Sequence, residues 1–308
     1  SSLKAVAGYY RQQGLDVIGL AMQGVAAKKL ADETGVAAVT LRSYLARKKT
    51  TDRKVLIFDE ASMLDSRNAE KLFKAVEQSG DKIILVGDMN QLEPINAGRV
   101  FERYVDYYAR MSRSTPSVQL VVMNENYRQR TPVLRLAVDM AKRGEMCASL
   151  EVLAKDGRIS EISDAGDRRA AIASLYDKHT LIIVGTTAAR DDVNRVIRHA
   201  QRASGKLHNG REYVLARDNE DGIKQDRVME LAPGDVIAFT RNEYQKYDVR
   251  NGEKAEVLEC GDNFLKVRME DSRILGIDAG NYKDIDYGYA LTTYKSQGQT
   301  YNRVIVEA

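Results

Sequence analysis

The sequence predicts an α/β fold in which helices cover both faces of parallel sheets. Short apolar segments without polar alternation recur along the chain, as in strands that are buried on both faces. They lie at residues 55–58, 83–86, 120–123, 181–184 and 304–306. Stretches with apolar residues at helical spacing lie between them, for example at residues 67–76. Such alternation of strands and helices is typical of α/β domains.

The composition is that of an ordinary globular protein. The 308 residues suffice for about two domains, and 44% are hydrophobic and 30% charged. The longest apolar runs are far shorter than the roughly 20 residues of a membrane helix, so we expect no membrane insertion. Only Cys147 and Cys260 are cysteines, which favours a reducing, cytoplasmic compartment and excludes a disulfide framework. The net charge of +3 permits nucleic-acid binding without indicating it.

The interval from about residue 231 to 283 has a different pattern. Turn sequences separate short β-rich runs there, and an Asn-Gly pair between such runs favours a hairpin. The turn sequences are at residues 233–235, 251–252 and 260–263, and the runs are at 254–258 and 264–268. We therefore expect a small β-module inserted in the second half of the chain.

Residues 55–63, VLIFDEASM, predict a buried strand that ends in two adjacent carboxylates. In P-loop NTPases a carboxylate at such a strand tip holds Mg²⁺ directly or through water, and Asp59 is the candidate. Glu60 follows at the carboxyl end of the sheet, where it can orient or deprotonate an attacking water. The alternative is that both residues open the next helix, where the helix dipole favours carboxylates.

Two further polar residues follow predicted strands. Gln91 comes after residues 83–86, and its neutral amide can hydrogen-bond a γ-phosphate or the attacking water. Arg128 comes after residues 120–123, and its guanidinium can neutralise phosphate charge. The alternatives are an ordinary polar loop residue for Gln91 and a surface ion pair for Arg128.

Several strings resemble, in order, the motifs of superfamily 1 helicases. They are LAMQGVAAKKL at 20–30 (motif Ia), TLRSYL at 40–45 (the segment after it), DEASM at 59–63 (motif II), GDMNQLEP at 87–94 (motif III), NYRQ at 126–129 (motif IV) and YALTTYKSQGQT at 289–300 (motif V). Together they span nearly the whole chain.

Within that superfamily the chain is similar to the RecD-like branch, which includes the helicase regions of conjugative relaxases of the TraA and TraI type. Residues 231–236 and 249–253 resemble the approach to the SH3-like insertion of that branch, and residues 186–194 resemble part of its second RecA-like domain. The resemblance implies two RecA-like P-loop NTPase lobes, at residues 1–116 and 117–308, with the SH3-like insertion at about 231–283.

The resemblance also implies an enzyme that uses ATP and Mg²⁺ to move on single-stranded DNA, typically 5′ to 3′. The implied catalytic residues are Glu60, Gln91 and Arg128, and the implied ATP-binding residues are Ser1, Asp59 and Gly298, of which Asp59 also holds Mg²⁺. The residues expected at DNA are Gly24, Thr40, Arg42, Tyr294, Ser296 and Gln297. Thr40 has an alternative role as a helix N-cap, and residues 296–298 have one as an ordinary turn.

Three features depart from the pattern of the branch. The Gly-rich loop ending in Gly-Lys-Ser/Thr, whose backbone amides and Lys cradle phosphates, is absent, and Ser1 stands where the following helix would begin. The arginine-bearing motif VI is also absent before Ala308. We therefore expect these 308 residues alone not to hydrolyse ATP. Tyr294 stands where a histidine is common, which favours a DNA contact there over catalysis.

Three hypotheses follow from the sequence. The first is the motor core of a RecD-like helicase from a conjugative relaxase-helicase, with relaxosome proteins as further partners. The second is a non-catalytic helicase-like module that binds single-stranded DNA. The third is a RecD-like subunit of a repair complex, which shares the chemistry of the first and differs in its flanking domains.

Overall fold

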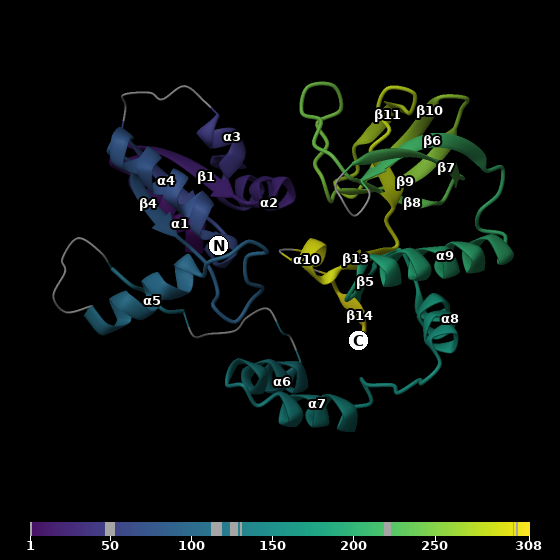
Figure 1. Ribbon diagram of the computed structural model, residues 1–308, viewed down its shortest axis with the longest axis horizontal. Coiled ribbons are helices and arrows are strands. Elements are labelled where there is room, and N and C mark those ends of the chain that lie inside the picture. The colour runs from purple at the N-terminus through teal and green to yellow at the C-terminus, as the bar shows by residue number, and fades with distance from the viewer. Residues whose placement is uncertain are drawn as a thin grey trace.

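The computed structural model describes residues 2–46, 53–111, 119–123, 129, 131–218, 223–297, 299 and 301–308. The chain forms two lobes with parallel sheets and an antiparallel β-module (Figure 1). We call residues 2–111 lobe 1, residues 165–203 together with 290–307 lobe 2, and residues 211–287 the β-module. The predicted α/β fold, with parallel sheets flanked by helices, is confirmed.

Lobe 1 is built on a four-stranded parallel sheet with the order β2-β1-β3-β4. Its strands are β1 (Asp16–Ala21), β2 (Ala37–Thr40), β3 (Lys54–Phe58) and β4 (Lys82–Leu85). Its helices are α1 (Ser2–Gln12), α2 (Gly24–Thr34), α3 (Leu41–Leu45), α4 (Ser66–Ser79) and α5 (Val100–Met111), with a short 3-10 helix η1 (Ala61–Met63).

Strand β3 is buried on both faces. Leu56 and Phe58 pack in a cluster with residues of α4, whereas Val55 and Ile57 pack in a second cluster with Ala7 of α1. This two-sided burial explains why the strand has no polar alternation. Its carboxyl end is therefore held rigidly between β1 and β4, which positions the residues that follow it.

Lobe 2 has a three-stranded parallel sheet with the order β13-β5-β14. The strands are β5 (Thr180–Val184), β13 (Ala290–Thr292) and β14 (Arg303–Glu307), and the helices are α8 (Ala165–Leu175), α9 (Thr187–Ala203) and α10 (Thr293–Ser296). Helices α8 and α9 bury the sheet through residues such as Ile172, Val193 and Ile197. Helix α10 follows β13 at the carboxyl edge of the sheet.

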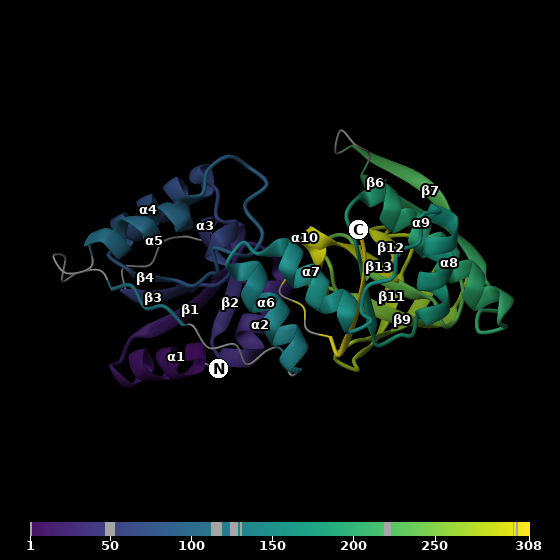
Figure 2. The same ribbon diagram turned by 90° about the horizontal axis from the view of Figure 1, so that it is seen from below.

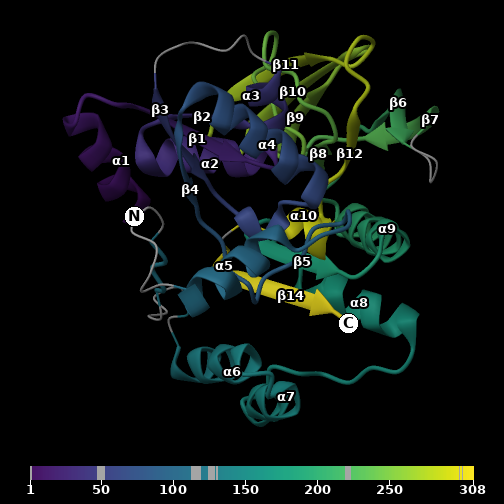
Figure 3. The same cartoon turned by 60° about the vertical axis from the view of Figure 1, so that its left-hand side comes forward.

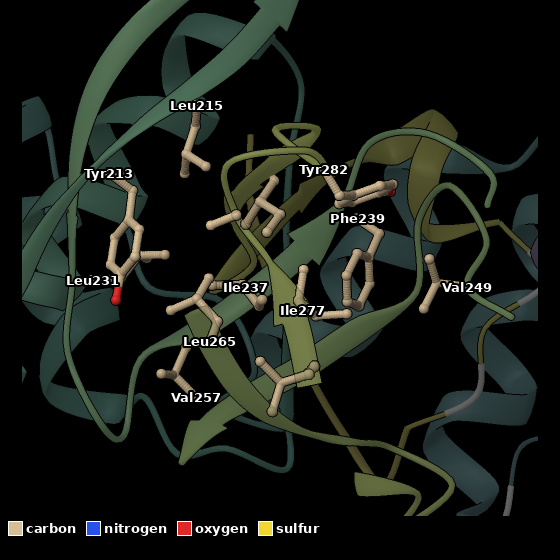
Figure 4. Packing of buried hydrophobic residues seen from close by; sticks show 14 of the residues in the cluster. Tyr213, Leu215, Leu231, Ile237, Phe239, Val249, Val257, Leu265, Ile277 and Tyr282 are labelled. Carbon is tan, nitrogen blue, oxygen red and sulfur yellow. The ribbon is translucent and has the colours of Figure 1, made fainter. Parts of the chain in front are cut away.

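The β-module is inserted between α9 and β13. A five-stranded antiparallel sheet has the order β11-β10-β9-β8-β12, and the hairpin of β6 and β7 packs against it. The strands are β6 (Arg211–Asp218), β7 (Lys224–Leu231), β8 (Val236–Phe239), β9 (Lys254–Cys260), β10 (Phe264–Met269), β11 (Ile274–Asp278) and β12 (Ile285–Tyr287). Figure 4 shows Leu215 and Leu231 of the hairpin beside Ile237 and Leu265 of the sheet.

The β-rich insertion that the sequence predicts is therefore present, and its SH3-like character stays a prediction. The β6–β7 hairpin precedes the interval that the sequence predicts for this insertion. Gly288 joins the β-module to lobe 2 and donates its backbone N–H to the carbonyl of Val236 at 2.8 Å. A Cβ at this position would lie 2.7 Å from the carbonyl carbon and oxygen of Ile237, so only glycine fits without a backbone shift.

One predicted strand is wrong. Residues 120–123 form no strand, and Val121, Val122 and Met123 are 79%, 65% and 71% exposed. An apolar run forms a strand only where a neighbouring strand pairs with it, and no described strand does so here. Three strands of the parallel sheets, β1, β2 and β13, are not among the strands that the sequence predicts.

A helical hairpin follows this segment. Helices α6 (Pro132–Lys142) and α7 (Met146–Lys155) pack on each other, and Ser149 Oγ donates to the carbonyl of Ala137 at 2.8 Å. The pair lies below both lobes in Figures 1 and 3 and in front of them when seen from below in Figure 2. No helix in the described part of the chain is long and apolar enough to cross a membrane.

Candidate nucleotide and DNA site

The carboxyl end of β3 is fixed by hydrogen bonds to both neighbouring strands. The backbone N–H of Asp59 donates to the carbonyl of Leu20 on β1 at 2.8 Å. The backbone N–H of Ala61 donates to the carbonyl of Val86, directly after β4, also at 2.8 Å. The two predicted carboxylates, Asp59 and Glu60, therefore sit on a backbone that is held from both sides.

Glu60 has a left-handed backbone conformation, with φ 52° and ψ 43°. This conformation costs a non-glycine residue about 1–2 kcal/mol, so it persists only where the surroundings impose it. The hydrogen bonds on either side impose it here, and Asp59 Oδ1 accepts a further one from the N–H of Glu60 at 3.0 Å. Strained residues of this kind cluster at functional sites, and the strain redirects the Glu60 side chain away from the strand axis.

Gln297 brings lobe 2 to this site. Its side-chain Nε2 lies 3.4 Å from Glu60 Oε2 and 3.3 Å from Gln91 Oε1, so one amide contacts both predicted catalytic side chains of lobe 1. The two hydrogen bonds are long. The Oε1 atom of Gln297 is buried and has no partner in the described part of the chain. The sequence predicts Gln297 at DNA, whereas the structure places it between the lobes, at a contact with Glu60 and Gln91 that we call the cleft.

Gln91 reaches the cleft from a turn that follows β4. Its backbone N–H donates to the carbonyl of Asp88 at 3.2 Å, and Asp88 Oδ1 accepts from the N–H of Asn90 at 3.0 Å. The structure thus brings together Glu60 and Gln91, as their positions after adjacent strands predict. Three further predicted site residues, Ser1, Arg128 and Gly298, lie outside the described residues.

Asp59 fits the oxygen chemistry that Mg²⁺ requires. No group of three or more His, Cys, Asp or Glu side chains in the described ranges could hold a metal ion. Mg²⁺ at nucleotide sites needs no such group, because it binds through one or two carboxylates and takes its other ligands from water and phosphates. A single carboxylate at the tip of a buried strand is therefore a suitable donor set for a nucleotide-bound Mg²⁺.

Asp65, between η1 and α4, is a buried carboxylate that the sequence patterns did not single out. It is 2% exposed, caps α4 by accepting from the N–H of Asn68 at 2.8 Å, and accepts from Asn96 Nδ2 at 3.1 Å. Burial alone would raise the pKa of Asp65, but the hydrogen bonds from Asn68 and Asn96 outweigh it and lower that pKa. The signal in the sequence was an aspartate directly before a helix, which is typical of an N-cap.

The residues expected at DNA have different surroundings. Thr40 is the N-cap of α3, where its Oγ1 accepts from the N–H of Ser43 at 3.3 Å, and Ser296 Oγ donates to the carbonyl of Thr293 at 2.8 Å. Both side chains therefore make the local bonds that their alternative roles predict. Arg42 is exposed on α3.

Tyr294 and Gly24 lie at contacts between lobes. Tyr294 of lobe 2 shares a side-chain hydrogen bond with Gln23, directly before α2, and burial raises the pKa of Tyr294. Gly24, the first residue of α2, is buried against the β-module, and a Cβ there would lie 3.0 Å from Asn242 Oδ1 and 3.3 Å from the Cβ of Arg250. Motif Ia thus contacts both lobe 2 and the β-module.

A second contact joins lobe 1 to the β-module through α2. Lys28 Nζ lies 2.6 Å from Glu253 Oε1 and 2.8 Å from Asp271 Oδ2. Burial would lower the pKa of Lys28, but its bonds to the two carboxylates outweigh burial and raise it. Burial would raise the pKa of Asp271, but hydrogen bonds from Lys28 and Arg273 lower it to about 2. The Lys28 ammonium and the Asp271 carboxylate therefore stabilise each other's charged forms.

Comparison with known proteins agrees with this arrangement. A family model described as an AAA domain matches residues 1–164. A probable conjugal transfer protein TraA from Sinorhizobium fredii is 29% identical over 99% of this chain, which spans 27% of that protein. The ATP-dependent RecD2 DNA helicase from Deinococcus radiodurans is 26% identical over 99% of the chain, which spans 41% of it.

Solved structures share the fold. A Bacteroides Pif1 structure bound to single-stranded DNA has a TM-score of 0.64 and 19% identity, covering 99% of this chain and 78% of that one. A Pif1 helicase structure from Bacteroides in complex with ADP-AlF3 and single-stranded DNA has a TM-score of 0.62 and 16% identity, covering 100% and 86%. The match spans both lobes and the β-module.

Proposed function

Since the chain belongs to the AAA domain family, whose model matches residues 1–164, we propose that it is the motor core of an ATP-dependent DNA helicase that moves on single-stranded DNA. The observation that carries this proposal is the contact of Gln297 of lobe 2 with both Glu60 and Gln91 of lobe 1. A motor that couples nucleotide turnover to lobe movement needs a group on one lobe that contacts the catalytic groups of the other.

Each side chain in the cleft has a role that suits its chemistry. Glu60 orients the attacking water and accepts its proton, because it is a carboxylate held at the strand tip next to Asp59. Gln91 and Gln297 are neutral amides, which can hydrogen-bond phosphate oxygens or water without adding charge. Asp59 holds Mg²⁺, which when bound neutralises charge on the phosphates.

Motif V links this cleft to the DNA-binding side in the proposal. Gln297 contacts the catalytic residues, and Tyr294, three residues earlier, bonds Gln23 within motif Ia. A change in the distance between the lobes therefore moves Tyr294 and Gln297 relative to lobe 1. Arg42, which is exposed, and the polar groups around α2 are the proposed contacts to the DNA backbone.

The biological setting is also a proposal. Two further TraA proteins, from Agrobacterium fabrum and Rhizobium radiobacter, are 31% and 29% identical to this chain. On that basis we propose a role in conjugative DNA transfer, 5′ to 3′ movement and relaxosome proteins as partners. A RecD-like role in repair uses the same motor chemistry and is the alternative.

The test is ATP hydrolysis by the full-length polypeptide that contains this chain, measured with and without oligothymidylate. We expect DNA-stimulated hydrolysis in the wild type and a loss of about 10²- to 10⁴-fold on Glu60→Gln, the range that general-base catalysis contributes. Glu77→Gln is the matched control, because Glu77 is an exposed glutamate on α4 and takes no part in the contact of Gln297 with Glu60 and Gln91. Wild-type turnover in Glu60→Gln, with DNA binding intact, would reject this role for Glu60.

A further inference from the structure

A cavity of about 720 Å³ lies between lobe 2 and the β-module, away from the nucleotide cleft. Its walls include residues 176–180 before and at the start of β5, residues 301–302 before β14, and residues 254–256, 268–270 and 272 of the β-module. Strands β5 and β14 are parallel to β13, and α10 follows the carboxyl end of β13. The cavity is therefore at the opposite edge of the lobe 2 sheet from α10, and its volume is in the range that small ligands occupy.

Lys254 is the buried cation in the wall of this cavity. It is 6% exposed, and no described side chain forms an ion pair or hydrogen bond with its ammonium. Its contact is with the face of the Tyr301 ring, with Nζ 5.3 Å from the ring centroid. Burial lowers the pKa of Lys254 to about 8, and the nearby Glu270 offsets this only in part. Buried lysines are rare without a paired charge, so this ammonium lacks its usual compensation.

The carboxylates near Lys254 are engaged elsewhere. Glu270 Oε1 accepts from the hydroxyl of Tyr301 at 2.5 Å, and Glu256 pairs with Arg268 at 3.4 Å. Asp177 accepts from the backbone N–H of His179 at 2.7 Å and lies 3.7 Å from Arg303.

The rim of the cavity adds positive charge. Lys178 and Lys206 line it, are exposed, and form no ion pair with a described residue. Three tyrosines, Tyr176, Tyr289 and Tyr301, also contribute to its wall. The lining therefore combines one deeply buried cation, two rim lysines that form no ion pair with a described residue, aromatic surface, and the carboxylates of Asp177, Glu256 and Glu270.

We propose that this cavity, which we call the lysine cavity, binds a small organic phosphate whose phosphate group pairs with Lys254. A phosphate dianion supplies the missing counter-charge to Lys254 and also attracts Lys178 and Lys206 at the rim, whereas an aromatic part of the ligand can lie against the tyrosines. The same phosphate chemistry is present in a free phosphate ester and in a DNA backbone, and the experiment separates these two sources. The proposal is independent of the helicase function.

The experiment measures pyrophosphate binding to the whole chain by calorimetry at pH 7 and low ionic strength. We expect saturable binding to the wild type, weakened about tenfold or more by Lys254→Met, because a charge-assisted hydrogen bond is lost. Lys266→Met is the control, since Lys266 is an exposed lysine on the neighbouring strand β10, and it should bind as the wild type does. If pyrophosphate binds Lys254→Met as tightly as it binds the wild type, the proposal is overturned. That result is expected if pyrophosphate binds only at the nucleotide cleft.

A second measurement does not depend on the variant folding. The wild type is treated with a limiting amine-reactive reagent, and mass spectrometry follows modification of Lys254. We expect pyrophosphate to slow that modification, and an unchanged rate at saturating pyrophosphate contradicts the site. Competition of pyrophosphate binding by oligothymidylate identifies a DNA phosphate as the ligand, and absence of competition identifies a free phosphate ester.

Discussion

Replacing Gln297 by glutamate places a like charge at the contact between the lobes. Gln297 Nε2 lies 3.4 Å from Glu60 Oε2, so Gln297→Glu puts a carboxylate oxygen at about that distance from the Glu60 carboxylate. With an effective dielectric constant of about 20, two unit charges 3.4 Å apart repel by about 5 kcal/mol. The substitution also removes two long hydrogen bonds, which together contribute at most about 1–2 kcal/mol. The repulsion is the larger effect.

Two responses can relieve this repulsion, and they differ in their dependence on pH. While both carboxylates are charged, we expect the lobes to separate. A neighbouring like charge raises the pKa of a carboxyl, so one of the pair takes up a proton first as the pH falls. We therefore expect Gln297→Glu to close again as the pH falls, whereas Gln297→Met, which removes the hydrogen bonds without adding charge, should stay close to the wild type throughout.

The assay is the distance distribution between two spin labels, one on the exposed face of α4 in lobe 1 and one on the exposed face of α9 in lobe 2. We expect Gln297→Glu to lengthen and broaden this distribution at pH 9 relative to the wild type and Gln297→Met. Equal distributions for all three proteins at pH 9 would refute the placement of Gln297 against Glu60.

Three other substitutions test contacts elsewhere. A double-mutant cycle between Lys28→Met and Glu253→Gln should give a coupling of about 1 kcal/mol in the free energy of unfolding at low salt and less in 1 M NaCl, because the pair is partly exposed. Lys254→Met should raise the free energy of unfolding more at pH 7 than above pH 10.5, and the difference between the two effects should be about 3 kcal/mol. This is the free energy that corresponds to a pKa lowered from 10.5 to about 8. Gly288→Ala should lower the melting temperature through overpacking of about 1–3 kcal/mol, whereas Gly185→Ala, with no atom within 4 Å of the added methyl, should not.

The sign of the Lys254 effect follows from proton linkage. Between pH 8 and 10.5 the unfolded state binds more protons at Lys254 than the folded state does. The free energy of unfolding of the wild type therefore increases relative to that of Lys254→Met as the pH rises through this window. A stability difference between the two proteins that stays constant from pH 7 to 10.5 would contradict the buried, uncompensated ammonium. A salt-independent coupling would likewise contradict the Lys28 ion pair, and equal melting temperatures for Gly288→Ala and Gly185→Ala would contradict the close backbone approach at Gly288.

Local sequence patterns predicted the strand tips and the residues that follow them. Strand β3 is a continuous apolar run followed by Asp59 and Glu60, and β4 is followed by Gln91, so adjacency of parallel strands sufficed to bring Glu60 and Gln91 to one edge. The apolar run at residues 120–123 has the same local pattern, yet no strand pairs with it. The local pattern indicates that a segment prefers to be buried, but it does not indicate which strand pairs with that segment.

The contacts between lobes could not be predicted in this way. Gln297 and Glu60 are 237 residues apart, and Lys28 and Glu253 are 225 apart. Whether such residues meet depends on how complete lobes pack, and no local periodicity encodes it. The buried state of Lys254 is likewise invisible in the sequence, because its neighbours on β9 alternate between the core and the cavity only once the β-module is assembled.

Directional movement on DNA tests the central claim most directly. The full-length polypeptide that contains this chain is incubated with ATP and an oligothymidylate that carries biotin and streptavidin at either its 3′ or its 5′ end. The proposed 5′ to 3′ motor displaces streptavidin from the 3′ end, and Glu60→Gln abolishes the displacement while DNA binding remains. DNA binding without ATP-dependent displacement from either end in the wild type would contradict the motor and identify a passive DNA-binding module.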